Sequence, residues 1–195
     1  MIFRILIILF VLLQTTFIYA EEWVEYEFTA VLDRYEGNVP FQLSNNDEIN
    51  GTFKFDISNN KVVKISGRGI YETTPRLIVK TVISGHIFDV NNITNNAPIL
   101  FNKNKNTSPL YDLIKIQADS NDYIESINVD NISFVFNFLD YTATALEGYT
   151  MPESIVLDKF TSSTLFVAGK YKGDNSKRPY WNIYYRLKTL RKLTQ

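Results

Sequence analysis

The sequence contains no cysteine and only one histidine. Without cysteine, the chain can form no disulfide framework, thiolate zinc site, cysteine nucleophile or cysteine-linked lipid anchor. Because His86 is the sole imidazole, mechanisms that require two imidazoles are excluded as well. The chain also lacks a surplus of basic residues, since 20 Lys and Arg stand against 21 Asp and Glu. Nucleic-acid-binding proteins normally carry such a surplus, so we expect no nucleic-acid partner.

Aromatic residues, in contrast, are abundant. The chain of 195 residues contains 14 Phe, 12 Tyr and 2 Trp, and 45% of its residues are apolar. This composition argues against disorder and is sufficient for a hydrophobic core.

The N-terminus has the features of a secretory signal peptide, which we expect to span residues 1–20. Arg4 supplies the positive charge, residues 5–13 form an uninterrupted apolar run, and Ala20 is a small residue at the expected cleavage point. The run has about half of the ~20 residues that a membrane-spanning helix requires, and an uncleaved anchor is the alternative. Cleavage would leave residues 21–195 as one secreted, periplasmic or extracellular domain without a membrane span. An exported domain without cysteine is more typical of bacteria than of animals.

Apolar and polar residues alternate along most of the remaining chain, which is the pattern of half-buried β-strands. In residues 23–32, Tyr26 and Phe28 share one face, and Glu25 and Glu27 share the other. Further strands are expected at residues 51–56, 61–66, 77–84, 85–90, 112–118, 123–129, 132–139, 163–171 and 180–190. Short strands at this spacing predict an all-β domain, a single antiparallel β-sandwich of jelly-roll or Ig-like type with little helix.

Three other segments carry signals for a hairpin, a loop and a helical turn. An Asn-Asn pair suits a tight turn, so residues 51–66 are predicted to form a β-hairpin. Residues 91–109, rich in Asn and containing two Pro, are predicted to be an exposed loop around a short apolar piece. Residues 141–149 are expected to form a turn or two of helix, bounded by Pro152.

The order of the N-terminal strands resembles that of a known group of proteins. The block Gly-Thr-Phe-Lys-Phe-Asp fills residues 51–56, after a strand with the sequence TAVLDRYEG at residues 29–37. It precedes Asn-Asn-Lys-Val-Val at residues 59–63, the end of a turn and the start of a Val-containing strand. This arrangement resembles exported β-sandwich proteins common among bacterial proteins with PEP-CTERM sorting tails, and residues 160–169 and 181–190 are similar to their last two strands. The resemblance implies an exported β-sandwich and supplies no catalytic residue. Because no Pro-Glu-Pro tail is present, it does not imply surface sorting.

Few residues are candidates for catalysis. A Ser/His/Asp arrangement would have to use His86, with Ser84 and Asp89 close by in sequence, but the Gly-x-Ser-x-Gly motif that presents a nucleophile is missing. We favour a structural role for His86. Glu25 and Glu27 would lie about 7 Å apart on one strand face, a spacing compatible with glycoside hydrolysis. A solvated strand face is the interpretation that we favour, and no catalytic residue is assigned.

A run of oxygen-bearing side chains at residues 119–122 is the one candidate metal site. Asp119, Asn121 and Asp122 are the calcium ligands that we would test, because calcium prefers hard oxygen ligands. The run lacks the EF-hand spacing, and a β-turn stabilised by Asx side chains is the favoured interpretation. No other cofactor is expected.

Aromatic and basic residues near the C-terminus form the one candidate ligand-binding site. Tyr180, Tyr184 and Arg186 are the residues that we assign to it, because Tyr faces stack on sugar rings and Arg186 shares a strand face with Tyr184. Trp181 shares its strand face with Ile183, so we expect Trp181 in the core and Tyr184 on the opposite face. The alternative is a second sheet face that a loop partly covers.

The sequence supports three hypotheses about function. The first is a non-enzymatic binding or structural domain at the cell exterior. The second is a carbohydrate-binding module or glycan-active enzyme, which would need an aromatic groove. The third is a subunit of a surface assembly, joined through an exposed strand edge. A glycan or a cell-surface component is the expected kind of partner.

Overall fold

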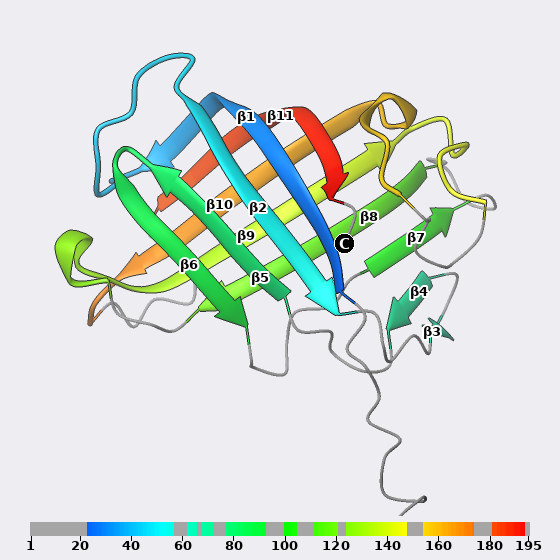
Figure 1. The fold of residues 1–195 in the computed structure, drawn as a ribbon, viewed down its shortest axis with the longest axis horizontal. Helices are drawn as coiled ribbons and strands as arrows, with labels where there is room; N and C mark the ends of the chain where they lie inside the picture. Colours follow the sequence, from blue (N-terminus) through cyan, green and yellow to red (C-terminus); the bar gives the residue numbers. More distant parts are fainter. Residues whose placement is uncertain are drawn as a thin grey trace, which may run out of the picture.

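The computed structural model describes residues 23–56, 62–65, 68–71, 77–92, 100–104, 111–120, 124–147, 154–173 and 181–193. Within these residues the protein is all-β, and its strands form one antiparallel sheet curled into a half-barrel (Figure 1). The strands are β1 (Trp23–Gly37), β2 (Glu48–Asp56), β3 (Val62–Ile65), β4 (Arg68–Tyr71), β5 (Leu77–Ile83), β6 (His86–Asn92), β7 (Leu100–Asn104), β8 (Tyr111–Ser120), β9 (Val129–Asp140), β10 (Ser162–Tyr171) and β11 (Trp181–Leu193). Two short 3-10 turns, η1 (Glu125–Ile127) and η2 (Leu157–Lys159), complete the assignment.

The sheet runs in the order β3-β4-β7-β8-β9-β10-β11-β1-β2-β5-β6. Its register shifts twice along β1, between Thr29 and Ala30 and between Leu32 and Arg34. Such irregularities increase the local twist of a strand, and the curled sheet brings β5 and β6 against β8. The expected antiparallel all-β class is confirmed. The two-sheet sandwich is not confirmed, because all the described strands belong to one hydrogen-bonded sheet.

The core fills the inner face of the half-barrel with aromatic rings. Phe53 and Phe136 lie with ring centroids 4.3 Å apart, and Phe28 meets Phe136 edge-on at 5.3 Å. The alternation of residues on β1, β2, β9 and β11 predicted this face. Val24, on the same face, is half-buried against the core, and the other side chains are buried: Tyr26, Phe28, Ala30, Leu32, Phe53, Phe55, Ile132, Phe134, Phe136, Phe138, Trp181, Ile183, Tyr185 and Leu187. Burial of this apolar surface is the main source of stability for a domain without disulfides.

Two of the elements predicted from the sequence do not form. The hairpin predicted at residues 51–66 does not form, because β2 pairs with β1 and β5 while β3 pairs with β4 at the far end of the sheet. The predicted turn, residues 57–60, lies outside the described residues. The strand predicted at residues 123–129 is replaced by η1 and by Asn128, whose φ of 54° ends the turn in a left-handed conformation that Asn tolerates.

Two further segments also differ from the expectation. Within the predicted loop at residues 91–109, the structure forms strand β7, which lies between β4 and β8. The described part of the predicted helical turn, residues 141–147, contains turns and bends without a helix. Among the residues described, no helix has the length and apolar character that crossing a membrane would require.

A loop anchored by buried carboxylates covers one end of the half-barrel. Asp140 accepts hydrogen bonds from the backbone N–H groups of Thr142, Thr144 and Ala145, at 2.8 to 3.0 Å. Asp112 lies opposite Asp140 in the β8–β9 register and accepts one from the backbone N–H of Leu146 at 2.8 Å. Burial tends to raise the pKa of Asp140, but these hydrogen bonds outweigh it and lower the pKa to about 2. The loop is therefore tied to the strand ends by charged acceptors.

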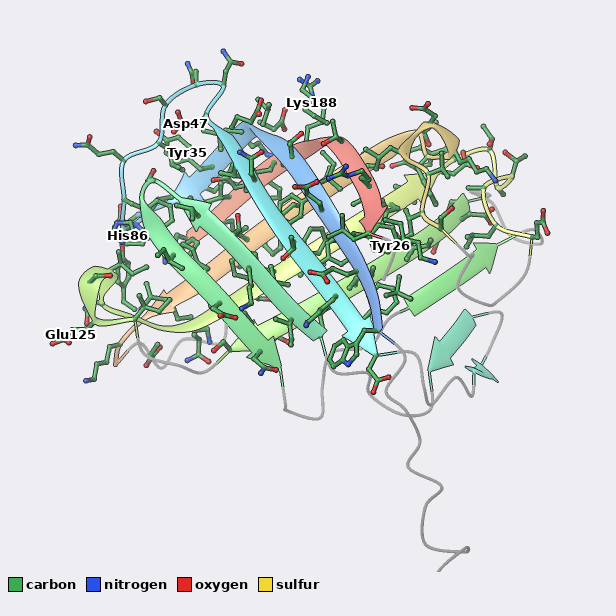
Figure 2. All side chains as sticks on the ribbon, viewed as in Figure 1. Tyr26, Tyr35, Asp47, His86, Glu125 and Lys188 are labelled. Carbon is green, nitrogen blue, oxygen red and sulfur yellow. The ribbon has the colours of Figure 1, made fainter. Side chains whose placement is uncertain are left out.

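The loop at residues 38–47 covers the other end, where Asp47 and His86 lie in Figure 2. The Asp47 carboxylate accepts a hydrogen bond from the Ser44 backbone N–H at 2.7 Å, and the Leu32 N–H donates to the Asp47 carbonyl at 2.8 Å. The Ser84 hydroxyl in the β5–β6 turn donates to the Gln42 carbonyl. This end is thus closed by a loop and a hairpin turn that touch each other.

Candidate functional site

A groove of about 650 Å³ lies on the outer face of the sheet, where β10, β11 and β1 meet the segment around η2. Two of the residues that the sequence assigned to ligand binding, Tyr184 and Arg186, line it. Its volume lies in the range of small-ligand pockets. The third assigned residue, Tyr180, lies outside the described residues.

The alternation of β11 places Tyr184, Arg186 and Lys188 on the outer face, opposite to the buried Tyr185 and Leu187. The register shift in β1 brings Arg34 directly opposite Tyr184. As a result, the Arg34 guanidinium lies 3.9 Å from the centroid of the Tyr184 ring, a cation–π contact. The Phe166 ring packs against the same tyrosine with the centroids 5.1 Å apart. Tyr184 therefore supports a guanidinium, and its ring is less open to sugar stacking than the sequence suggested.

The charges around the groove are unevenly compensated. Arg34 is 3.2 Å from Asp33 and 3.6 Å from Glu36, so two carboxylates balance its charge. Within the described residues, neither Arg186 nor Lys188 has an ion-pair partner. The cross-strand neighbours of Arg186 are the uncharged Thr164 and Val31. Arg186 and Lys188 are thus cations without a direct ion pair, and with Arg34, Asp33 and Asp158 the formal charge of the groove lining is +1. The Lys188 side chain extends away from the sheet in Figure 2.

Hydroxyl groups line the β10 side of the same groove. Thr161, Ser162, Ser163 and Thr164 all contribute to its wall. The Ser163 hydroxyl oxygen is buried and has no hydrogen-bond partner among the described residues. Asp158 adds a carboxylate, which can accept hydrogen bonds from ligand hydroxyls. The groove therefore combines cations for an acidic group with polar atoms for hydroxyl groups.

Sequence reasoning missed Arg34, Lys188 and the hydroxyl residues of this groove. The alternation of β11 indicated that Lys188 shares a face with Arg186, and this signal could have added it. Nothing in the sequence places Arg34 beside Tyr184, because that contact depends on the register shift after Leu32.

The candidate calcium ligands are only partly described. Asp119 lies on the outer face of β8, and both of its carboxylate oxygens accept hydrogen bonds from the Gln117 side-chain amide, at 3.0 and 3.1 Å. Asn121 and Asp122 lie outside the described residues. The described part of the chain contains no group of three or more acidic or histidine side chains suited to a metal ion. The calcium site remains a prediction.

The residues considered for catalysis are dispersed. The His86 ring stacks near Phe41, with centroids 5.7 Å apart, and its Nδ1 is 3.5 Å from the Ser126 hydroxyl. Ser84 donates to the loop that covers this end, and Asp89 pairs with Lys80 at 3.0 Å. The structure therefore does not assemble Ser84, His86 and Asp89 into a catalytic triad.

The two glutamates of β1 lie on its outer side. Glu27 pairs with Arg191 of β11 at 2.5 Å, and Glu25 lies in register with Lys54 and Leu193. Neither glutamate lines the groove described above. This supports the interpretation of a solvated strand face.

The strand edge required by the assembly hypothesis can also be located. β6 is the last strand at one edge of the described sheet. The β5–β6 hairpin exposes two apolar side chains, Ile87 with 77% and Val82 with 48% of its surface accessible. Assembly through this edge remains a prediction.

Comparison with known proteins gives no family for this chain: no family model, curated protein or solved structure matches it.

Proposed function

We propose that this is an exported, non-enzymatic binding protein whose outer-face groove takes an acidic polysaccharide at the cell exterior. The observation that carries the proposal is the pair of cations without an ion-pair partner among the described residues, Arg186 and Lys188, beside a wall of Ser and Thr residues. Cations pair with carboxylate or sulfate groups, and serine and threonine hydroxyls exchange hydrogen bonds with sugar hydroxyls. The signal-peptide features of residues 1–20 support export.

The contact between Arg34 and Tyr184 gives the groove a fixed centre. Arg34 is held from one side by the aromatic ring and from the others by Asp33 and Glu36. A side chain held in this way loses little conformational freedom when a ligand binds, which favours affinity. The groove is open on the outer face, a geometry that suits a polymer segment.

The proposal is tested by calorimetric titration of the secreted protein with polygalacturonate, dextran sulfate and neutral dextran. We expect the two acidic polymers to bind at low salt and neutral dextran not to bind. The double variant Arg186→Gln, Lys188→Gln should bind the acidic polymers about tenfold more weakly, since each lost ionic contact contributes about 0.5–1 kcal/mol. Higher salt should weaken the binding of the native chain.

The matched control is Lys80→Gln, which removes a positive charge from the outer face of β5, outside the groove. We expect it to bind the acidic polymers as the native chain does. Equal weakening by the control and by the double variant would mean that net charge alone drives binding. Binding of neutral dextran with the same affinity would contradict the role of the cations.

A further inference from the structure

A second groove, of about 460 Å³, continues the first one along β11. The two grooves share Leu157, Asp158 and Lys188 in their linings, so they meet beside η2. One wall of the second groove is formed by residues 188–192 of β11, and the other by residues 154–158. The candidate site therefore extends toward the C-terminal end of β11.

The β11 wall of the second groove is a strand edge. Strand β10 pairs with β11 only as far as Arg186, so residues 188–191 have no strand partner on that side within the described part of the chain. Their other side pairs with β1. A strand edge presents backbone N–H and C=O groups that no neighbouring strand satisfies. Sugar hydroxyls suit such an edge, because each can both donate and accept a hydrogen bond.

An irregularity in the strand turns Arg191 toward the outer face. The register between β1 and β11 shifts beside Lys188, which has no β1 partner. One extra residue in a strand moves the later side chains to the opposite face. Without the shift, Arg191 would share the inner face with the buried Leu187; instead it pairs with Glu27 on the outer face, at 2.5 Å. The shift thus places a further cation along the second groove.

The two linings together concentrate positive charge. They contain five basic and two acidic side chains, a formal charge of +3, although the whole chain has a net charge of −1. Ion pairs with neighbouring carboxylates hold Arg34 and Arg191 in place. Arg186 and Lys188 lie between these two along the sheet, and they have no ion-pair partner among the described residues. A surface with this charge favours an acidic polymer over a neutral one.

The two grooves together are longer than one sugar unit. Tyr184 and Arg191 are seven residues apart on β11, which is about 23 Å at a rise of about 3.3 Å per residue. The opposite wall is held by Ile155, which is buried and whose backbone N–H donates to the Tyr26 hydroxyl at 3.0 Å. Val156, next to it, is 43% exposed and offers an apolar surface to the C–H groups of a sugar ring.

We propose that the two grooves are successive subsites for one acidic polysaccharide chain, so that the protein recognises a segment of several sugar units rather than a single acidic sugar. This inference rests on the polysaccharide function proposed above and adds the length of the segment bound. Arg191 serves the second subsite, and Lys188 serves both. Because the units of a chain are linked, contact in the second subsite follows contact in the first at a high effective concentration, and affinity rises with chain length.

The experiment is calorimetric titration of the secreted protein with the dimer, tetramer and hexamer of galacturonate at one low salt concentration. We expect the hexamer to bind at least about tenfold more tightly than the dimer. Arg191→Gln should weaken hexamer binding about two- to fivefold and leave dimer binding unchanged, since the dimer fits within the first groove. Arg191→Lys keeps the charge and should recover most of this loss.

The matched control is Lys80→Gln. Like Arg191, Lys80 forms an exposed ion pair across two strands, with Asp89 at 3.0 Å, but it lies outside both grooves. We expect this variant to bind the hexamer as the native chain does. Amide NMR spectra give a readout that does not depend on charge: the Thr189 and Leu190 signals should shift with the hexamer and not with the dimer.

Four results would each overturn the inference: equal affinity for dimer and hexamer, no loss in Arg191→Gln, an equal loss in Lys80→Gln, or unshifted Thr189 and Leu190 signals. A long chain that slides along the first groove alone would bind more tightly than the dimer but would be insensitive to Arg191→Gln. In all these cases polygalacturonate still binds, so the proposed function stands. If no acidic polymer binds, the function itself is contradicted.

Discussion

The two ends of the half-barrel use buried polar side chains in opposite ways. At the end covered by residues 141–147, Asp140 and Asp112 accept hydrogen bonds from four backbone N–H groups. At the other end, the buried Tyr185 hydroxyl has no partner among the described residues. The first end uses its carboxylates to hold a loop in place, although Oδ1 of Asp112 also has no partner among the described residues, whereas the Tyr185 hydroxyl holds no segment in place. This difference predicts opposite effects on stability when the polar group is removed at each end.

The largest effect is expected at the carboxylate-anchored end. Asp140→Ala leaves the N–H groups of Thr142, Thr144 and Ala145 without their acceptor and removes a charged hydrogen-bond network. We expect the free energy of unfolding to fall by about 2–4 kcal/mol, measured by denaturant titration. The matched control is Glu147→Ala, an exposed acidic residue of the same loop, which should change it by less than about 0.5 kcal/mol. Similar small losses in both variants would show that Asp140 does not anchor the loop.

The pH dependence of stability provides a second check on Asp140. Its folded pKa is lowered from 3.8 to about 2, so the carboxylate stabilises the fold fully above the unfolded pKa. This contribution should be lost as the pH falls from about 4 to about 2. Asp140→Asn should lose less stability across this window than the native chain does. If the variant and the native chain fall in parallel, the lowered pKa is not linked to folding.

A smaller effect of opposite sign is expected at the other end. Tyr185→Phe removes a buried hydroxyl that has no partner, so we expect the free energy of unfolding to rise by about 1 kcal/mol. The control is Tyr26→Phe, because the Tyr26 hydroxyl accepts a hydrogen bond from the Ile155 backbone N–H at 3.0 Å. This variant should lose about 1 kcal/mol instead. A loss in both variants would mean that the Tyr185 hydroxyl is satisfied in the folded protein.

The sequence predicted which face of a strand a residue occupies, but not which strands pair with each other. Alternation along single strands predicted the buried rings of Phe134 and Phe136 and the outward positions of Tyr184 and Arg186, because these depend only on a period of two. The partners of each strand were not predictable in the same way. The turn signals favoured a hairpin at residues 51–66, but β2 instead pairs with β1 and β5.

Prediction of the site residues was limited in the same way, because their contacts join segments that are distant in the sequence. Arg34 reaches Tyr184 only because the register shifts after Leu32, and such a shift has no marker in the sequence. Tyr185 was correctly assigned to the core, but its missing partner depends on where the loop carrying Asp47 lies. Face assignments thus follow from local sequence, while contacts between distant strands and loops require the tertiary structure.

Amide hydrogen exchange tests the contrast between the two ends most directly. The amides of Thr144, Ala145 and Leu146 donate to the buried carboxylates of Asp140 and Asp112, so they should exchange slowly, near the rate set by global unfolding. The amides of Ser44 and Asp47, which bond only within a loop turn, should exchange faster. Equal protection at both ends would contradict the account.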